Sequence, residues 1–488
     1  MTHEAGRHLR RWRPAFVVSV GGSSRLRLRQ RPHRPAVAHG DNPGPAKSFP
    51  GVEHPSFGRR DTRYTVSVMS PSRATDAVLG GLDQIRAWQE DLYRGLHEHP
   101  ELSHQEIRTA RSVSERLGAC GYEVHDGIGG TGVVGILRNG PGPTVLLRAD
   151  MDALPVLEKT GLDYASTEFA TEDGNQVPVM HACGHDVHVT ALLGAAQLLA
   201  DGADHWAGTV VALFQPAEET ADGARAMVDD GLAALLPDVD VAFAQHVLPL
   251  PAGLVGTRAG PFMASADSIR VTVYGRGGHG SMPQSTIDPV VLAAMIIVRL
   301  QTVVSREIAP TEAAVLTVGS VQAGSKSNVI PDHAVLLLNI RTYSEQTRAA
   351  VIGAIRRIVA AECAAAGSPQ DPQFEMFDRF PLTDNDVQTT ERVRGAFEAF
   401  FGDRCREMPQ GAGSEDFSEI PSALGVPYSY WGIGGTDPEA FRQALERGRV
   451  NEEIPVNHSP SFAPVVQPTL DTGTQALVVA ALSWLAPS

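Results

Sequence analysis

Strand-like and helix-like segments alternate between residues 133 and 244, and this order constrains the fold more than any other feature of the sequence. Apolar, strand-like runs occupy residues 133–137, 144–147, 209–214 and 239–244. The first two runs are joined by a turn rich in Gly and Pro, and helical spacing follows at residues 187–201 and 223–231. Because helices between neighbouring strands cover the faces of a sheet, we predict an α/β fold with a mixed, mostly parallel sheet flanked by helices.

The order of elements changes between residues 263 and 378. Strand-like and helical segments follow one another there as β-α-β-β-α-β, at residues 268–274, 289–308, 314–321, 334–342, 344–366 and 373–378. This is the order of a ferredoxin-like α+β unit of about a hundred residues, complete in itself. We therefore expect residues 263–378 to form a domain inserted into a discontinuous catalytic domain made of residues 76–262 and 379–488.

The composition is that of a globular protein with more than one core. The chain has 488 residues, of which 42% are hydrophobic and 20% charged, with a formal net charge of -15. An acidic chain is a poor candidate for nucleic-acid binding, and no apolar run suggests a membrane span. Its only four Cys, at positions 120, 183, 363 and 405, show no CxxC pairing. We expect no disulfides and a cytoplasmic protein without nucleic-acid or membrane partners.

The first 75 residues are rich in Arg, Pro and Gly and lack apolar periodicity, which predicts a disordered extension. Arg10 and Arg11 precede only a short apolar run, so a secretory or twin-arginine signal is weakly indicated, and an organelle transit peptide is a second interpretation. A third interpretation, which we favour, places the true start of translation at Met69.

Residues 181–188 contain three His, one Cys and one Asp, directly before an apolar helix-like run. Cys183 and His185 alternate, so in an extended segment their side chains would point the same way. A thiolate and an imidazole on one side of the chain could form half of a metal site. A buried Cys beside a helix-capping loop is the alternative, and this segment alone leaves both interpretations open.

Polar side chains also follow other predicted strands of the outer domain. They are Asp150, Asp152, Glu218, Glu219, His246, Glu415, Asp416 and His458. The carboxyl ends of parallel strands meet at one edge of a sheet, so we expect several of these groups to lie close to Cys183 and His185. Two divalent metals need roughly five or six ligands, and this set can supply them.

Eight segments of the chain resemble the M20 metallopeptidase family, and more closely its aminoacylase/amidohydrolase branch, which includes hippurate hydrolase. The segments are LLRADMDALPV, MHACGHDVHVTALLG, FQPAEE, AQHVLP, GRGGHGSMPQSTIDPV, SNVIPD, GSEDFS and NHSPSF. The resemblance runs from about residue 80 to the end of the chain. It implies a metal-dependent hydrolase with two divalent ions, Mn or Zn, and an inserted domain that serves as a lid and as the interface of a homodimer.

The resemblance also implies roles for the residues. Cys183 would bridge the two ions, and the other metal ligands would be His185, Glu219, His246 and His458. Glu218 would be the general base, which takes a proton from the metal-activated water and returns one to the leaving amine.

Further residues have implied supporting roles. Asp152 would orient the catalytic groups, and the role of Asp150 stays open. His279 would stabilise the oxyanion in the partner subunit's site, with Asn328 in support. Arg341 could pair with a substrate carboxylate, although an ordinary surface Arg is the interpretation we prefer.

These roles predict hydrolysis of the amide bond of N-acyl amino acids or similar small conjugates. A dipeptidase or carboxypeptidase of the same family is the alternative. The resemblance favours the amidohydrolase branch, because this chain has Cys183 at the bridging position, where the peptidase branches of the family have an Asp. A non-catalytic binding protein built on the same scaffold is a third interpretation, and it conflicts with the presence of all five proposed ligands and Glu218.

Overall fold

The computed structural model describes residues 71–486 of the chain. The interpretations of the first 68 residues lie outside this range. The helix α1 (Pro71–Leu79) begins at Pro71, so the predicted disorder does not hold for residues 71–75. A second helix, α2 (Leu82–Glu98), follows after a short break at Gly80 and Gly81.

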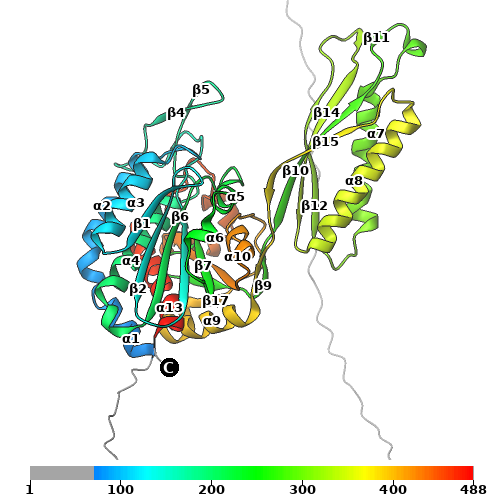
Figure 1. Ribbon diagram of the computed structural model, residues 1–488. Helices are drawn as coiled ribbons and strands as arrows, with labels where there is room; N and C mark the ends of the chain where they lie inside the picture. The colour runs from blue at the N-terminus through cyan, green and yellow to red at the C-terminus, as the bar shows by residue number, and fades with distance from the viewer. Residues whose placement is uncertain (1–70, 487–488) are drawn as a thin grey trace, which may run out of the picture. The chain divides into compact units, whose positions relative to one another are not determined.

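The larger sheet has eight strands in the order β1-β2-β6-β3-β7-β18-β8-β17 (Figure 1). Their bounds are β1 (Glu123–Ile128), β2 (Gly132–Asn139), β3 (Thr144–Asp150), β6 (Gly208–Gln215), β7 (Val241–Pro251), β8 (Val255–Thr257), β17 (Cys405–Glu407) and β18 (Tyr428–Thr436). The central strands β6, β3, β7 and β18 pair in parallel, whereas β1·β2, β2·β6 and β8·β18 are antiparallel. The predicted mixed sheet is therefore confirmed.

Helices cover both faces of this sheet, and the side chains of β3 are therefore buried on both sides. Val145, Leu147 and Ala149 of β3 belong to one core, and Leu146 belongs to another. The first core includes α2, α3 (Ile107–Ala119), α4 (His185–Asp201), α9 (Val387–Phe401) and α13 (Val466–Leu485). The second includes α5 (Gly223–Asp229), α6 (Leu232–Leu235) and α10 (Glu419–Leu424). Strands buried on both faces read as continuous apolar runs, as residues 144–147 do.

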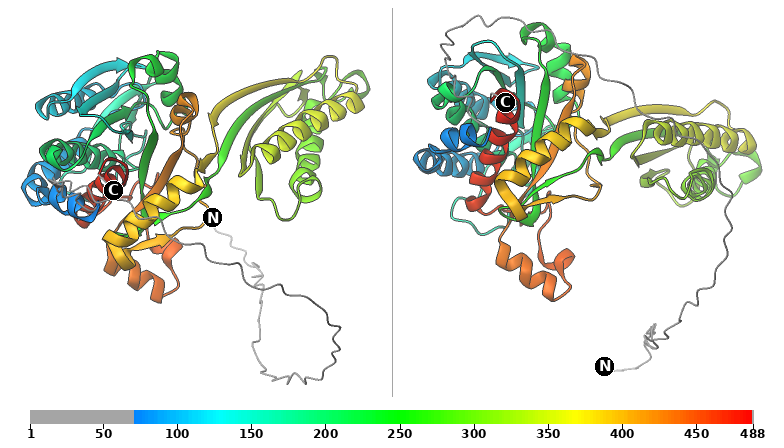
Figure 2. Two further views of the ribbon diagram at one scale, coloured as in Figure 1. Left: turned by 60° about the horizontal axis from the view of Figure 1, so that its bottom comes forward. Right: turned by 90° about the horizontal axis from the view of Figure 1, so that it is seen from below.

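Helix α4 is buried along almost its whole length. It packs against α2 and α13 as well as against β3, and the views in Figure 2 show the C-terminal helix α13 running beside it. A helix enclosed in this way is largely apolar on all sides, which agrees with the Ala, Leu and Val residues that make up most of it after its polar first turn. Its N-terminus is thereby fixed at the edge of the sheet where β3 and β6 end.

The smaller sheet has four antiparallel strands in the order β12-β14-β10-β15. It consists of β10 (Ser265–Tyr274), β12 (Ala314–Gln322), β14 (His333–Thr342) and β15 (Gln373–Phe380), with the helices α7 (Pro289–Thr302) and α8 (Glu345–Ala366). The two helices share a separate hydrophobic core with the sheet. This order of elements and strands confirms the ferredoxin-like prediction, and we call residues 265–380 the four-stranded unit.

Short elements complete the described chain. They are the hairpin β4 (Phe169–Glu172) and β5 (Asn175–Pro178), the pair β9 (Gly260–Met263) and β16 (Thr383–Asn385), the pair β11 (Gly278–His279) and β13 (Val329–Ile330), and the helices α11 (Pro438–Glu446) and α12 (Val450–Glu453). The pair β9·β16 lies in sequence just outside the two ends of the four-stranded unit.

Candidate metal centre

The five predicted ligands come together from four segments of the chain at or next to the larger sheet. Cys183 precedes α4 and His185 begins it, Glu219 follows β6, His246 lies on β7, and His458 precedes α13. The ligand atoms of Cys183, His185 and His246 all lie within 4.8 Å of one another, and so do those of Cys183, Glu219 and His458. Cys183 therefore belongs to two triads of potential metal ligands.

The backbone around Cys183 differs from the extended segment that we expected. Gly184 has a left-handed φ of 83°, and His185 is the first residue of α4. A side chain at Gly184 would clash with Val247, so only glycine fits this turn. Cys183 and His185 thus converge because the chain turns sharply into a helix.

The ligand atoms include buried polar groups that lack partners. Within the described residues, neither Nε2 of His185 nor Oε1 of Glu219 has a hydrogen-bond partner. Such groups are rare in folded proteins because losing their hydration without compensation is costly. Sγ of Cys183 lies 3.4 Å from Nε2 of His246, and Nε2 of His458 lies 3.4 Å from Oε1 of Glu219. A thiolate, three imidazoles and a carboxylate that face one another in this way fit divalent metal ions.

Hydrogen bonds from behind orient the imidazoles. Nδ1 of His246 donates to the carbonyl of Val247 at 2.8 Å, and Nδ1 of His185 donates to Asp152 at 3.2 Å. In both rings Nε2 is therefore the nitrogen that faces the cluster. The other carboxylate oxygen of Asp152 accepts from Ser103 at 2.7 Å and from the backbone N–H of Glu219 at 2.9 Å. Asp152 thus connects two candidate ligands, as its predicted orienting role requires.

Asp150 and His188 lie one layer further from the cluster. Nδ1 of His188 donates to Asp150 at 2.5 Å, and its Nε2 accepts from the backbone N–H of Val247 at 2.8 Å. Both ring nitrogens are used, so His188 has no atom left for a metal. His188 is buried, which rules out the helix surface as its location. Asp150 also accepts from Arg148 at 2.6 Å, and this fixes it as a support for the neighbouring helix.

A buried network beneath the cluster was not anticipated. The guanidinium of Arg148 donates to Gln215 at 2.9 Å, to Glu415 at 2.8 Å and to Asp416 at 3.2 Å. Glu415 and Asp416 therefore neutralise Arg148 and lie outside the two ligand triads. Their carboxylates also lie within 4.8 Å of Glu218. Burial, together with the charges of Glu415 and Glu219, raises the pKa of Glu218 well above its usual range.

Glu106, which the sequence analysis did not identify, holds the loop that carries Glu218. Ala217 has a left-handed φ of 52°, and its N–H donates to Oε1 of Glu106 at 2.8 Å. Glu106 is completely buried and also accepts from Thr131 at 2.5 Å and from the backbone of His104 at 3.0 Å. In the sequence Glu106 only marks the start of a helix, where acidic residues are common. No local signal distinguishes it from an ordinary helix-start residue.

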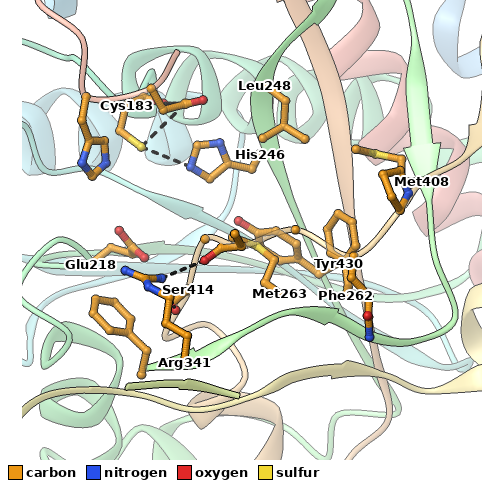
Figure 3. A pocket seen from close by; sticks show the side chains of 18 of the residues that line it. Cys183, Glu218, His246, Leu248, Phe262, Met263, Arg341, Met408, Ser414 and Tyr430 are labelled. Carbon is orange, nitrogen blue, oxygen red and sulfur yellow. Dashed lines mark hydrogen bonds between the residues drawn. The ribbon is translucent and has the colours of Figure 1, made fainter. Parts of the chain in front are cut away.

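The cluster opens into a pocket of about 490 Å³ (Figure 3). Glu218 and four of the five candidate ligands line it, and Arg341 at the end of β14 lines it as well. NH1 of Arg341 donates to the carbonyl of Ala412 at 2.8 Å and to Ser414 at 3.0 Å. The preferred interpretation of Arg341 as an ordinary surface residue is therefore wrong.

Two predicted catalytic residues lie elsewhere in the chain. His279 and Asn328 are exposed on the four-stranded unit and do not line the pocket. The N–H of Gly280 donates to the carbonyl of Asn328 at 2.8 Å, so the two predicted residues belong to neighbouring loops.

The chain is similar to known proteins of one family. Residues 146–458 match the model of peptidase family M20/M25/M40. The chain is 37% identical to thermostable carboxypeptidase 1 of Saccharolobus solfataricus over 72% of this chain and 86% of that protein. It is 38% identical to hippurate hydrolase of Campylobacter jejuni over 67% of this chain and 83% of that protein. A crystal structure from Bacillus subtilis, of a dinuclear metal binding peptidase from the M20 family, is 31% identical and superposes with a TM-score of 0.66. That match covers 82% of this chain and 98% of that one.

Proposed function

The chain belongs to peptidase family M20/M25/M40 and is a metal-dependent amidohydrolase, and from this premise we propose which residues perform the reaction. The reaction is hydrolysis of the amide bond in N-acyl amino acids or similar small conjugates. One observation carries the proposal: two ligand triads share Cys183, while the carboxylate of Glu218 faces the same pocket.

We propose that Cys183, His185, Glu219, His246 and His458 hold two divalent ions, Mn or Zn. The Bacillus subtilis relative is a dinuclear metal binding peptidase, which supports two ions. Bound ions would supply a Lewis acid for the acyl carbonyl and would lower the pKa of water near it. The unpartnered Nε2 of His185 and Oε1 of Glu219 support their assignment as ligands.

Glu218 is the general base of the proposed reaction. It takes a proton from the attacking water and transfers it to the leaving nitrogen. Burial and the neighbouring carboxylates raise its pKa well above the usual range, which makes the protonated form more accessible than it is for an exposed glutamate. A base of this kind can both accept and return a proton during one turnover.

Arg341 binds the carboxylate of the amino-acid product in this proposal. Within the described residues, its Nε and NH2 have no hydrogen-bond partner, while NH1 is held by the loop at Ala412 and Ser414. A guanidinium that is fixed at one nitrogen and free at the others can donate two hydrogen bonds to a carboxylate. The substrate would then be anchored at one end by Arg341 and at its amide by the metal centre.

We further propose a homodimer formed by the four-stranded unit as a lid and dimerisation domain. Helix α7 exposes Val290, Val291, Met295 and Val298, and the edge strand β12 exposes Val315 and Val321. By length and composition Pro289–Glu307 could cross a membrane, but the inner side of α7 packs into the core of the four-stranded unit. An apolar helix face beside an unpaired strand edge suits a second copy of the chain, which would bring His279 and Asn328 to the partner's pocket.

A carboxypeptidase or dipeptidase is the second candidate, favoured by the likeness to thermostable carboxypeptidase 1. A non-catalytic binding protein is disfavoured by the intact set of Glu218 and five ligands. We place the enzyme in the cytoplasm, because all four Cys are unpaired, as expected in a reducing compartment.

The experiment is metal-dependent hydrolysis by the full chain. After treatment with a chelator, Mn²⁺ and Zn²⁺ are added back separately, and amino-acid release is followed from N-acetyl, N-benzoyl and dipeptide substrates. Release from the acyl amino acids only when metal is present is the expected result. Release from dipeptides alone would establish the peptidase, and metal-loaded protein that hydrolyses none of them would contradict the proposed function.

A further inference from the structure

The pocket has two chemically different ends. One end carries the metal cluster, Glu218 and Arg341. The other end contains no charged group among the described lining residues. Its apolar side chains are those of Leu248, Phe262, Met263, Met408 and Tyr430 (Figure 3). If the amino-acid part of a substrate occupies the charged end, the acyl part must extend toward the apolar end.

Strand β7 connects the two ends directly. His246 and Leu248 are two residues apart on this strand, so their side chains lie on the same face of the sheet. An acyl carbonyl close to His246 therefore directs its substituent along Leu248. The ring of Phe262 lies 6.0 Å from that of Tyr430, and the Tyr430 hydroxyl is occupied by Glu415 at 2.5 Å. The hydroxyl of Tyr430 is thus already engaged, so this part of the pocket wall offers the substrate apolar surface.

Met408 forms the far wall of this apolar end and rests on two glycines. Gly256 and Gly432 are paired across β8 and β18. A Cβ atom at Gly256 would clash with the sulfur and Cγ of Met408, and one at Gly432 would lie 3.0 Å from the sulfur. Met408 can occupy this position only because Gly256 and Gly432 have no side chains beneath it. Methionine is flexible and polarizable, and it suits a wall against rings or alkyl chains.

We propose that the apolar end is a subsite for a bulky apolar acyl group, aryl or medium-chain alkyl, and that Met408 sets its depth. This inference rests on the proposed function, since it concerns the acyl part of the same substrates. Burial of each further methylene adds favourable transfer free energy until the wall is reached, and longer groups are then rejected by overlap. Acetyl groups are too short to reach this wall, so N-acetyl substrates should be hydrolysed more slowly than substrates with longer acyl groups.

The test compares kcat/KM of the metal-loaded enzyme across one series of N-acyl derivatives of a single amino acid. The series runs from acetyl through butanoyl, hexanoyl and octanoyl, with benzoyl as the aryl member. We expect the wild type to prefer hexanoyl or benzoyl over acetyl by about tenfold or more. Met408→Ala should raise the octanoyl-to-butanoyl ratio by about tenfold, whereas the volume-conserving Met408→Leu should keep the wild-type profile.

A second variant predicts the opposite change. Gly256→Ala displaces Met408 into the subsite and should lower the octanoyl-to-butanoyl ratio, and this effect should disappear in the Gly256→Ala/Met408→Ala double variant. Acetyl as the best substrate, or ratios that do not respond to Met408→Ala, would overturn the subsite while leaving amide hydrolysis intact. Wild-type enzyme that hydrolyses no member of the series would instead overturn the proposed function itself.

Discussion

Glu218 and Glu219 are adjacent in the chain but have different neighbours. Oε1 of Glu219 has no hydrogen-bond partner within the described residues and lies 3.4 Å from Nε2 of His458, in the position of a ligand. Glu218 instead lies beside the carboxylates of Glu415 and Asp416, which make its charged form less favourable. Two neighbouring carboxylates thus acquire different tasks from their surroundings, since one is suited to bind a cation and the other to exchange a proton.

This difference predicts the behaviour of Glu218→Gln. The variant should keep both metal ions, because Glu218 is not a proposed ligand, and it should lose about 100-fold or more in kcat, because an amide does not exchange the proton. Elemental analysis of purified protein and steady-state kinetics measure the two quantities. The exposed Glu115→Gln serves as the matched control. Near-normal turnover in Glu218→Gln would remove this residue from the mechanism.

Cys183 is the residue that the two ligand triads share, so its loss should affect both ions. We expect Cys183→Ala to retain the fold and to bind far less metal than the wild type, as measured by elemental analysis after dialysis. Cys363→Ala is the control, because Cys363 is also buried but belongs to the core of the four-stranded unit. Two equivalents of metal in Cys183→Ala would exclude the bridging role.

At the scale of elements, Glu106 links the start of α3 to the loop after β6. Because Ala217 is held in a left-handed conformation by this carboxylate, Glu106→Ala should displace Glu218 and lower kcat by about 10- to 100-fold with little change in KM. Glu106→Gln should restore most of kcat, since its carbonyl can still accept from Ala217. Thr131→Val, which removes only a side contact, is the control. Equal losses in the Ala and Gln variants would argue against positioning by this hydrogen bond.

His97 joins α2 to the N-terminal turn of α4 and to the loop before β4. Its Nδ1 donates to Asp186 at 2.7 Å and its Nε2 to Glu158 at 3.2 Å, while Tyr93 and Tyr164 pack against the ring. Burial lowers the pKa of His97, but the hydrogen bonds to Asp186 and Glu158 outweigh it and raise the pKa from 6.5 to about 9. Both nitrogens therefore carry protons at neutral pH.

The raised pKa predicts a stability change at alkaline pH. The charged His97 stabilises the fold fully below about pH 6.5, and this contribution of about 3 kcal/mol is lost as the pH rises through about 9. Urea unfolding of wild type and His97→Gln between about pH 6 and about pH 10 should show a difference in unfolding free energy that shrinks with pH. The exposed His99→Gln should show a small, nearly constant difference. If the unfolding free energy of the wild type exceeded that of His97→Gln by the same amount at every pH, His97 would not be charged in the folded protein.

The sequence predicted most elements, because helices and strands here follow local periodicity, but it did not predict their neighbours. Residues 133–137 and 144–147 are joined by a short turn, yet β6 lies between the two strands in the sheet. Likewise, Glu218 and the five candidate ligands could be proposed from motifs, whereas Arg341 and Glu106 could not be placed. Arg341 contacts a loop about seventy residues later, and Glu106 contacts one more than a hundred residues later. Such pairings are fixed by tertiary packing, which leaves no local pattern.

At the scale of the whole molecule, the centre is incomplete in one chain if His279 acts in catalysis. His279 is exposed on β11, and within the described residues the only hydrogen bonds of its side chain are those that Nδ1 accepts from the N–H and hydroxyl of Ser281. The imidazole Nε2 is thus available to a second molecule. The exposed apolar face of α7 and the edge of β12 that has no neighbouring strand among the described residues belong to the same four-stranded unit, so the proposed dimer interface and His279 lie on one unit.

Mixing two inactive variants tests this connection. Glu218→Gln and His279→Ala should each be nearly inactive as homodimers, because every site lacks one group. A mixed dimer contains one site with the Glu218 of one subunit and the His279 of its partner, so it should be active. Half of the dimers in an equimolar, co-expressed mixture are mixed and each has one working site, which predicts recovery of about a quarter of wild-type activity. Separate affinity tags on the two variants isolate the mixed dimer. An inactive mixed dimer, or full activity of His279→Ala alone, would show that His279 does not act across the interface.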